Sequence, residues 1–178
     1  MDPVTVATTI ARPREEIFDY LADIANHPEF MDHFTERWHL TREDSYGVGA
    51  GARFHVNRRL NRFSWADVTF VEVDRPRRIV EVGRTGKYNR IRTLTVFELE
   101  PAASGQTRVE VTMETQGKNL SDRLLEAVGT RAYFKGRLGK SLRRLRSILE
   151  EDRGRGKRVT VAGGGPRKPA SGFHFTAG

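Results

Sequence analysis

The chain has 178 residues, long enough for one domain with a buried core, and 37% hydrophobic and 30% charged residues fit a globular rather than a membrane-embedded protein. It contains no cysteine, which excludes disulfides, thiolate metal sites and a thiol nucleophile. The net charge is +8, but six of the 31 Lys and Arg residues lie in 153–178, so residues 1–152 hold 25 basic and all 23 acidic side chains. This distribution does not support a nucleic-acid footprint across the whole chain.

Neither a targeting signal nor a membrane-spanning segment is evident in the sequence. No apolar run approaches the length that spans a bilayer, and the first residues lack the basic start and apolar stretch of a signal peptide. We therefore expect a cytoplasmic protein without stable membrane insertion.

The first 116 residues read as a strand, two short helices and then a series of strands. A strand at Val4–Ile10 is followed by a helix that begins near Pro13 and ends near Asp23, because Pro and acidic residues favour a first helical turn. A shorter helical turn is predicted at Asn26–Met31. Six further strands are predicted at Thr35–Thr41, Ala52–Asn57, Ser64–Asp74, Arg78–Gly83, Asn89–Glu100 and Thr107–Thr115. Because no helix separates these strands, we expect an antiparallel sheet.

A long helix from Asn119 to Asp152 is the most regular part of the chain. Ser121 is a plausible N-cap, and leucines recur at helical spacing to form one apolar stripe. The helix contains three glycines (Gly129, Gly136 and Gly139). They are either weak points, at about 1 kcal/mol each relative to Ala, or small residues that keep space open over the sheet.

The composition changes after Asp152 to Gly, Pro, Lys and Arg. We expect residues 1–152 to form the folded domain and residues 153–178 a flexible basic tail without apolar side chains that pack on it.

Three local signatures make this order of elements resemble a known superfamily. They are the strand and Pro-broken helix at Val4–Asp23, the short Asn26-His27-Pro28-Glu29-Phe30 segment, and the glycine-led Gly49-x-Gly51-x-Arg53-Phe54 strand. Together they resemble the helix-grip superfamily (SRPBCC), which includes START-like domains, the birch-pollen-allergen fold and polyketide cyclase/dehydrase-like proteins. The resemblance covers residues 1 to about 152.

The resemblance implies an α+β helix-grip fold, in which a curved antiparallel sheet of about seven strands wraps around the long C-terminal helix and two short helices follow the first strand. It also implies a cavity for a small hydrophobic molecule between sheet and helix. In such a sheet the candidate ligand-binding side chains are Phe54, Val56, Trp65, Asp67, Thr95, Phe97, Val111 and Met113, facing Leu125 and Val128 on the helix. The alternative is that the apolar members simply fill a solid core.

No sequence motif identifies a catalytic site. Enolate stabilisation or proton transfer during polyketide-type cyclisation would need a buried His, Arg or Tyr, for which His55, Arg92 and Tyr88 are the candidates. Strand alternation, however, places His55 opposite Phe54 and Val56, hence toward solvent if those two point inward.

We expect no metal and no cofactor. The histidines lack the spacing of a metal-binding motif. The segment Gly47-x-Gly49-x-x-Ala52 is followed by a strand instead of the helix that a dinucleotide fingerprint requires.

Three functions stay open from sequence. The first is binding of a polyketide, lipid, quinone or aromatic molecule with cyclisation or dehydration; the second is a non-catalytic carrier or sensor of such a ligand. The third is a basic adaptor, because the C-terminal helix is rich in Arg and Lys and continues into the basic tail; nucleic-acid attraction would be weak and tail-mediated. Oligomeric state is not predicted.

Overall fold

The computed structural model describes residues 2–57, 64–116, 130–154 and 159. One antiparallel sheet carries the strands β1 (Val4–Ile10), β2 (Thr35–Leu40), β3 (Gly51–Val56), β4 (Trp65–Asp74), β5 (Arg78–Thr85), β6 (Ile91–Pro101) and β7 (Thr107–Gln116). The α-helices are α1 (Arg14–Leu21), α2 (His27–Met31) and α4 (Thr130–Glu151), and the short 3-10 turns are η1 (Ile24–Asn26), η2 (Lys87–Asn89) and η3 (Ala103–Gly105).

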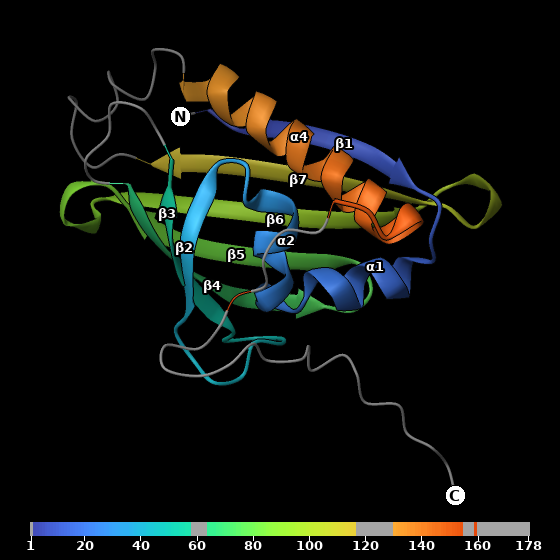
Figure 1. The fold of residues 1–178 in the computed structure, drawn as a ribbon, viewed down its shortest axis with the longest axis horizontal. Helices are drawn as coiled ribbons and strands as arrows, with labels where there is room; N and C mark the ends of the chain where they lie inside the picture. The colour runs from blue at the N-terminus through green and yellow to red at the C-terminus, as the bar shows by residue number, and fades with distance from the viewer. Residues whose placement is uncertain (1, 58–63, 117–129, 155–158, 160–178) are drawn as a thin grey trace, which may run out of the picture.

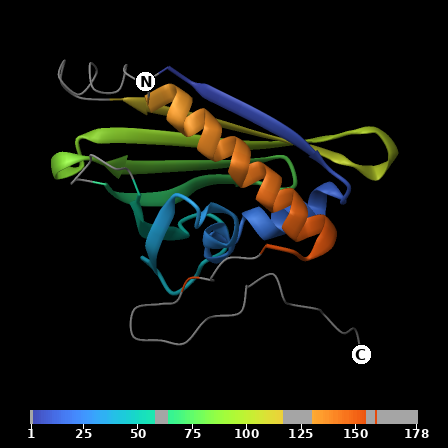
Figure 2. The same ribbon diagram turned by 45° about the horizontal axis from the view of Figure 1, so that its top comes forward.

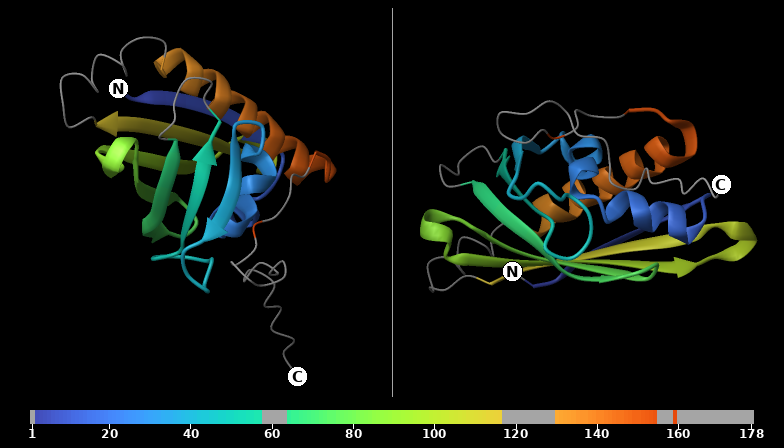
Figure 3. Two further views of the ribbon diagram at one scale, coloured as in Figure 1. Left: turned by 60° about the vertical axis from the view of Figure 1, so that its left-hand side comes forward. Right: turned by 90° about the horizontal axis from the view of Figure 1, so that it is seen from below.

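The seven strands lie in the order β1-β7-β6-β5-β4-β3-β2, with every pair antiparallel. Each strand from β2 to β7 therefore pairs with its neighbour in sequence, as consecutive hairpins do, and β1 closes the sheet beside β7. The helices lie on one side of the curved sheet, and α4 crosses it diagonally (Figures 1, 2 and 3). This is the helix-grip architecture that the sequence predicts.

The alternation of side chains decides which residues face the helices. In β7, Val109 and Val111 are buried on the side of the sheet that the helices cover, while Arg108 on the other face is exposed. Helix α4 presents Leu138, Leu142, Leu145 and Leu149 to the same layer, at the spacing that places them on one face. The buried cluster between sheet and helices is continuous.

The end of α4 is joined to the break between β1 and α1. The guanidinium Nε of Arg12 donates to the carbonyl of Leu149 at 2.7 Å, and the backbone N–H of Ala11 donates to Oε1 of Glu150 at 2.6 Å. A cation at a helix C-terminus satisfies carbonyls that have no partner within the helix. These bonds fix the far end of α4 against the start of the sheet.

Two sequence predictions concern the start of the C-terminal helix and the segment that follows it. The predicted helix start, including Ser121 and Gly129, lies outside the described residues, and α4 is described from Thr130. Val159 is 3% exposed and belongs to the core cluster. The expectation that nothing after Asp152 packs on the domain is therefore wrong at this residue.

Candidate ligand-binding cavity

A cavity of about 120 Å³ lies between the inner face of the sheet and helices α2 and α4. Six aromatic side chains from several elements line it, namely Phe30, Phe34, Trp38, Phe54, Phe97 and Phe134. The sheet contributes small side chains at inward positions, such as Ala66, Thr93 and Thr115, where larger ones would fill the space. The cavity therefore lies over small residues on the strands, beneath helix α4.

Six of the predicted ligand-binding residues lie in this wall: Phe54, Val56, Thr95, Phe97, Val111 and Met113. They come from β3, β6 and β7, which the sheet order and the curvature bring around one space. Leu125 and Val128 lie outside the described residues.

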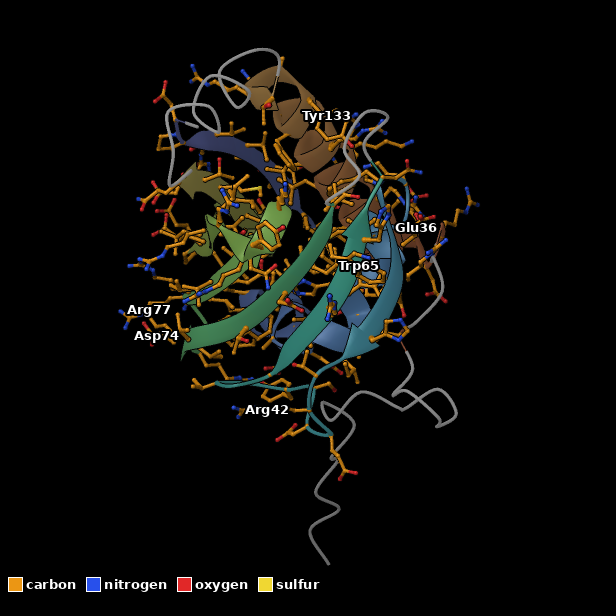
Figure 4. The ribbon with its side chains drawn as sticks, turned by 90° about the vertical axis from the view of Figure 1, so that its left-hand side faces the viewer. Glu36, Arg42, Trp65, Asp74, Arg77 and Tyr133 are labelled. Carbon is orange, nitrogen blue, oxygen red and sulfur yellow. The ribbon has the colours of Figure 1, made fainter. Side chains whose placement is uncertain are left out.

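Trp65 and Asp67 do not lie in the wall, because the inward positions of β4 are Ala66, Val68 and Phe70. Trp65 instead packs on the outer face, where the guanidinium of Arg53 lies 5.2 Å from its ring centre, and Asp67 lies 3.6 Å from Arg53 Nε. Figure 4 shows Trp65 and Glu36 at the β2–β4 end of the sheet. The prediction that Trp65 points inward is wrong, because Ala66 and Val68 point inward and side chains alternate along a strand.

The predicted catalytic candidates also lie away from the cavity wall. Tyr88 is 77% exposed in the turn between β5 and β6. Arg92 lies on the outer face, in a groove that also contains Asp67 and Glu114. Neither side chain is placed to act on a molecule inside the cavity.

His55 points outward, as its alternation predicts, and touches the cavity only through Ser64. Its Nε2 lies 2.6 Å from the Ser64 hydroxyl, which lines the cavity. Its Nδ1 lies 3.1 Å from Oε1 of Glu36. These contacts join β2 and β3 to the start of β4.

Glu81 is the acidic side chain in the described wall, and sequence reasoning did not select it. It is 9% exposed, and burial raises the pKa of its carboxyl to about 7 although a hydrogen bond from the Thr95 hydroxyl favours the charged form. The sequence pattern does not predict that Glu81 faces inward. Its neighbours Val80 and Val82 are apolar and lie on the opposite face of β5, so hydrophobic alternation would place the valines inside and Glu81 outside.

His27 forms the deep end of the wall. Its ring packs against Phe30, Phe70 and Phe97, with ring centres 5.3 to 5.7 Å apart. Burial lowers its pKa to about 4, so the ring is neutral near pH 7, and its Nε2 lies 2.9 Å from the carbonyl oxygen of Leu21.

Helix α4 contributes a polar group to the cavity wall. The Ser141 hydroxyl is buried, lines the cavity and makes no hydrogen bond to any of the described residues. A buried hydroxyl is normally satisfied, so a polar group of a bound molecule would be its natural partner.

Gly136 does not keep the cavity open. It is exposed, and a Cβ built on it would meet no atom within 4 Å. Gly136 precedes Leu138 by two residues, and positions two apart do not share a helix face. The expected role of this glycine in the cavity is therefore wrong.

The basic face of α4 is partly used within the fold. Arg144 forms an ion pair with Asp32 and donates to the carbonyl of Glu29 at 3.3 Å, so it joins α4 to α2. Arg146 pairs with Glu150 at 2.9 Å on α4 itself. These contacts give two of the helix arginines a structural role.

The described part of the chain has neither a membrane-spanning helix nor a metal-binding cluster. None of its helices is long and apolar enough to cross a membrane. Within the same residues, no group of three or more His, Asp or Glu side chains is arranged to hold a metal ion.

The sheet, the long helix and the cavity between them define a helix-grip protein with an internal apolar cavity. Residues 1–150 match the family described as "Polyketide cyclase / dehydrase and lipid transport". The chain belongs to this family. A search of curated proteins gave no significant match.

Solved structures share the fold at low sequence identity. The truncated norcoclaurine synthase from Thalictrum flavum is 13% identical with a TM-score of 0.65, covering 84% of this chain and 94% of that one. The protein TTHA0849 from Thermus thermophilus is 12% identical with a TM-score of 0.64, covering 85% and 99%. DynU16, a putative protein in the dynemicin biosynthetic locus, is 17% identical with a TM-score of 0.58; the match covers 86% of this chain but only 49% of DynU16, about half its length. These likenesses support the fold alone.

Proposed function

We propose that this protein binds a small, largely apolar molecule in the cavity between the sheet and α4. The observation that carries the proposal is the lining itself, which is mostly aromatic and aliphatic with a few polar groups, as in small-molecule sites generally. A dry apolar cavity of roughly 150 Å³ can hold benzene. At about 120 Å³, this cavity suits one ring, or one ring-sized part of a larger molecule.

We further propose that Glu81 supplies the proton chemistry if the ligand is a substrate. A carboxyl with a pKa near 7 can take a proton from a carbon beside a carbonyl and return it to a leaving hydroxyl, the two transfers that a dehydration following ring closure requires. The carboxyl ends in its starting state, and water is the only other product. This role fits cyclisation or dehydration of a polyketide-like substrate.

The rival function is a carrier or sensor that holds the same kind of molecule without changing it. The variant Glu81→Gln separates the two functions, because it keeps the size of the side chain and removes the titrating group. An enzyme would retain binding and lose turnover, whereas a carrier would show no turnover in either form.

The binding proposal is tested by an apolar fluorescent probe and by mass spectrometry of an organic extract of the purified protein. Ser141→Leu places a larger side chain in the cavity and should abolish probe uptake. Gly136→Leu is the matched control, because it adds the same side chain on the exposed face of the same helix. Equal uptake by both variants would refute binding in this cavity.

A further inference from the structure

The described cavity wall carries few titratable groups. Among its described residues, Glu81 and His27 are the only titratable ones, and none is Lys or Arg. His27 is neutral near pH 7 because burial lowers its pKa to about 4. The described part of the wall is therefore neutral or negative, and it offers a carboxylate ligand no counter-ion.

The aromatic rings favour a positive charge. Ring faces are negative, so a cation that lies over them is attracted, most strongly where water is excluded. Trp38 and Phe54 stack with ring centres 4.1 Å apart and an angle of 22°, and both line the cavity. Phe30 and Phe97 add rings near His27.

Glu81 is a buried acid that has no basic partner among the described residues of the wall. Its pKa shift has two causes, which are burial and the hydrogen bond from Thr95. The fold has already removed this carboxyl from water, so a ligand cation would gain the ion pair without a second desolvation cost for the carboxylate.

We propose that the cavity selects a compact ligand that carries one positive charge on nitrogen, as an amine or a quaternary ammonium group, attached to an apolar body, with Glu81 as the counter-ion. The inference rests on the proposed binding function and names the class of ligand. The aromatic rings surround the apolar body and the nitrogen. The Ser141 hydroxyl accepts a hydrogen bond from an amine N–H.

The pH dependence follows from the groups that face Glu81. Its strand neighbours are Phe70 on β4 and Thr95 on β6, and across the cavity α2 presents His27 while α4 presents Ser141 and apolar side chains. His27 stays neutral above pH 5, so Glu81 alone titrates in this wall between pH 6 and 8. Amine affinity should rise through that interval, since an alkyl amine stays charged to about pH 10.

The test compares four probes on the full chain by protein-observed NMR titration at pH 8: benzylamine, benzyltrimethylammonium, benzyl alcohol and benzoate. We expect at least one of the two cations to bind about tenfold or more tightly than benzyl alcohol, the scale of a single desolvated charge contact, and benzoate to bind most weakly. In Glu81→Gln the advantage of the cation over the alcohol should fall several-fold; the ratio of the two affinities is the quantity compared, because a change of the cavity that affects both probes cancels in it.

Each outcome distinguishes the two proposals. Equal binding of the cations and the alcohol, or preferred binding of benzoate, would overturn the charge selectivity and leave the cavity function standing. Failure of all four probes together with failure of the apolar fluorescent probe would overturn both. A cation preference that survives in Glu81→Gln would overturn the role of Glu81.

Calorimetry gives an independent readout of the counter-ion. Near its pKa the Glu81 carboxyl is partly protonated, so at pH 7 benzylamine should release a fraction of a proton per molecule bound as the carboxyl ionises. Benzyl alcohol should release none. Binding enthalpies in buffers of different ionisation enthalpy measure this number, and proton release that is the same for Glu81→Gln would contradict the assignment.

Discussion

Glu81 and Thr95 face each other across strands β5 and β6, and the Thr95 hydroxyl donates a hydrogen bond to the buried Glu81 carboxyl. Both side chains point into the cavity. A single neutral donor does not replace the water that burial removes, so the charged form of Glu81 stays unfavourable. This pair gives the described cavity wall its acid and makes the stability of the domain depend on pH.

Glu81→Gln should stabilise the protein at pH 8 and have little effect near pH 4. The folded-state pKa of about 7 lies above the ordinary value of 4.5, so the native state retains a proton that the unfolded state loses. The resulting penalty grows as pH rises from 4.5 to 7, to an upper figure of about 3 kcal/mol. Urea unfolding at pH 5 and pH 8 measures it, and a variant that is less stable at pH 8 would contradict the burial argument.

The free energy of unfolding of His27→Gln should change with pH in the direction opposite to that of Glu81→Gln. Burial lowers the pKa of His27 from 6.5 to about 4, so its contribution to stability is present above pH 6.5 and is lost as pH falls toward 4. Between pH 4.5 and 6.5 the effects of His27 and Glu81 cancel in the native protein. Each single variant should expose the slope of the remaining group, about 1.4 kcal/mol per pH unit: positive with rising pH in Glu81→Gln and negative in His27→Gln.

The comparison of the two slopes is the control for this prediction, because it does not depend on how much either substitution changes the overall stability. Parallel slopes in the two variants would show that at least one of these side chains is not buried as described.

Sequence reasoning located the strands and both N-terminal helices within about two residues, because strand alternation and Pro or Gly breaks act locally. It placed the polar residue Thr95 in the wall but did not select the acidic residue Glu81. The register places Val80 and Val82 on the face of β5 opposite to Glu81, although Val80 is itself buried, and Glu81 faces inward, the reverse of the pattern that periodicity assumes. A polar residue that faces a cavity breaks the local rule for a reason that only the fold reveals.

The same limit explains the errors at Trp65 and Gly136. A large aromatic residue is usually placed in the core, but the phase of β4 is set by Ala66 and Val68, which leaves Trp65 outside. Gly136 was considered for its size alone, whereas its face depends on the helical phase set by Leu138. The residue type drew attention to Trp65 and Gly136, but the direction in which each one faces depends on its position relative to the buried residues of the same strand or helix.

Two glycine variants should change stability in opposite directions. A Cβ on Gly83 would lie 2.5 Å from Oγ1 of Thr93 and 2.8 Å from the carbonyl oxygen of Asp67, so Gly83→Ala should cost about 1 to 3 kcal/mol by overpacking. Gly136→Ala meets open space on an exposed helix face and should stabilise by up to about 1 kcal/mol. Thermal unfolding of the two variants beside the native protein measures both, and a neutral Gly83→Ala would show that β4 and β6 yield easily at this point.

Truncation after Asp152 should destabilise the domain because it removes Val159. This side chain is 3% exposed within the core cluster, and burying a valine contributes about 1.5 to 3 kcal/mol. Truncation also removes the Gly154 carbonyl that accepts a hydrogen bond from Arg144 at 3.0 Å. The melting temperature should fall by about 3 to 10 °C for a chain of this size.

Truncation after Ala162 is the matched control, since it retains both groups while it removes residues 163–178. We expect this shorter truncation to have the melting temperature of the full chain. Val159→Ser in the full chain should reproduce most of the fall in melting temperature caused by truncation after Asp152. If the chain cut after Asp152 melts with the full chain instead, then Val159 adds nothing to the core, and the domain ends at Asp152 as the composition of the tail predicts.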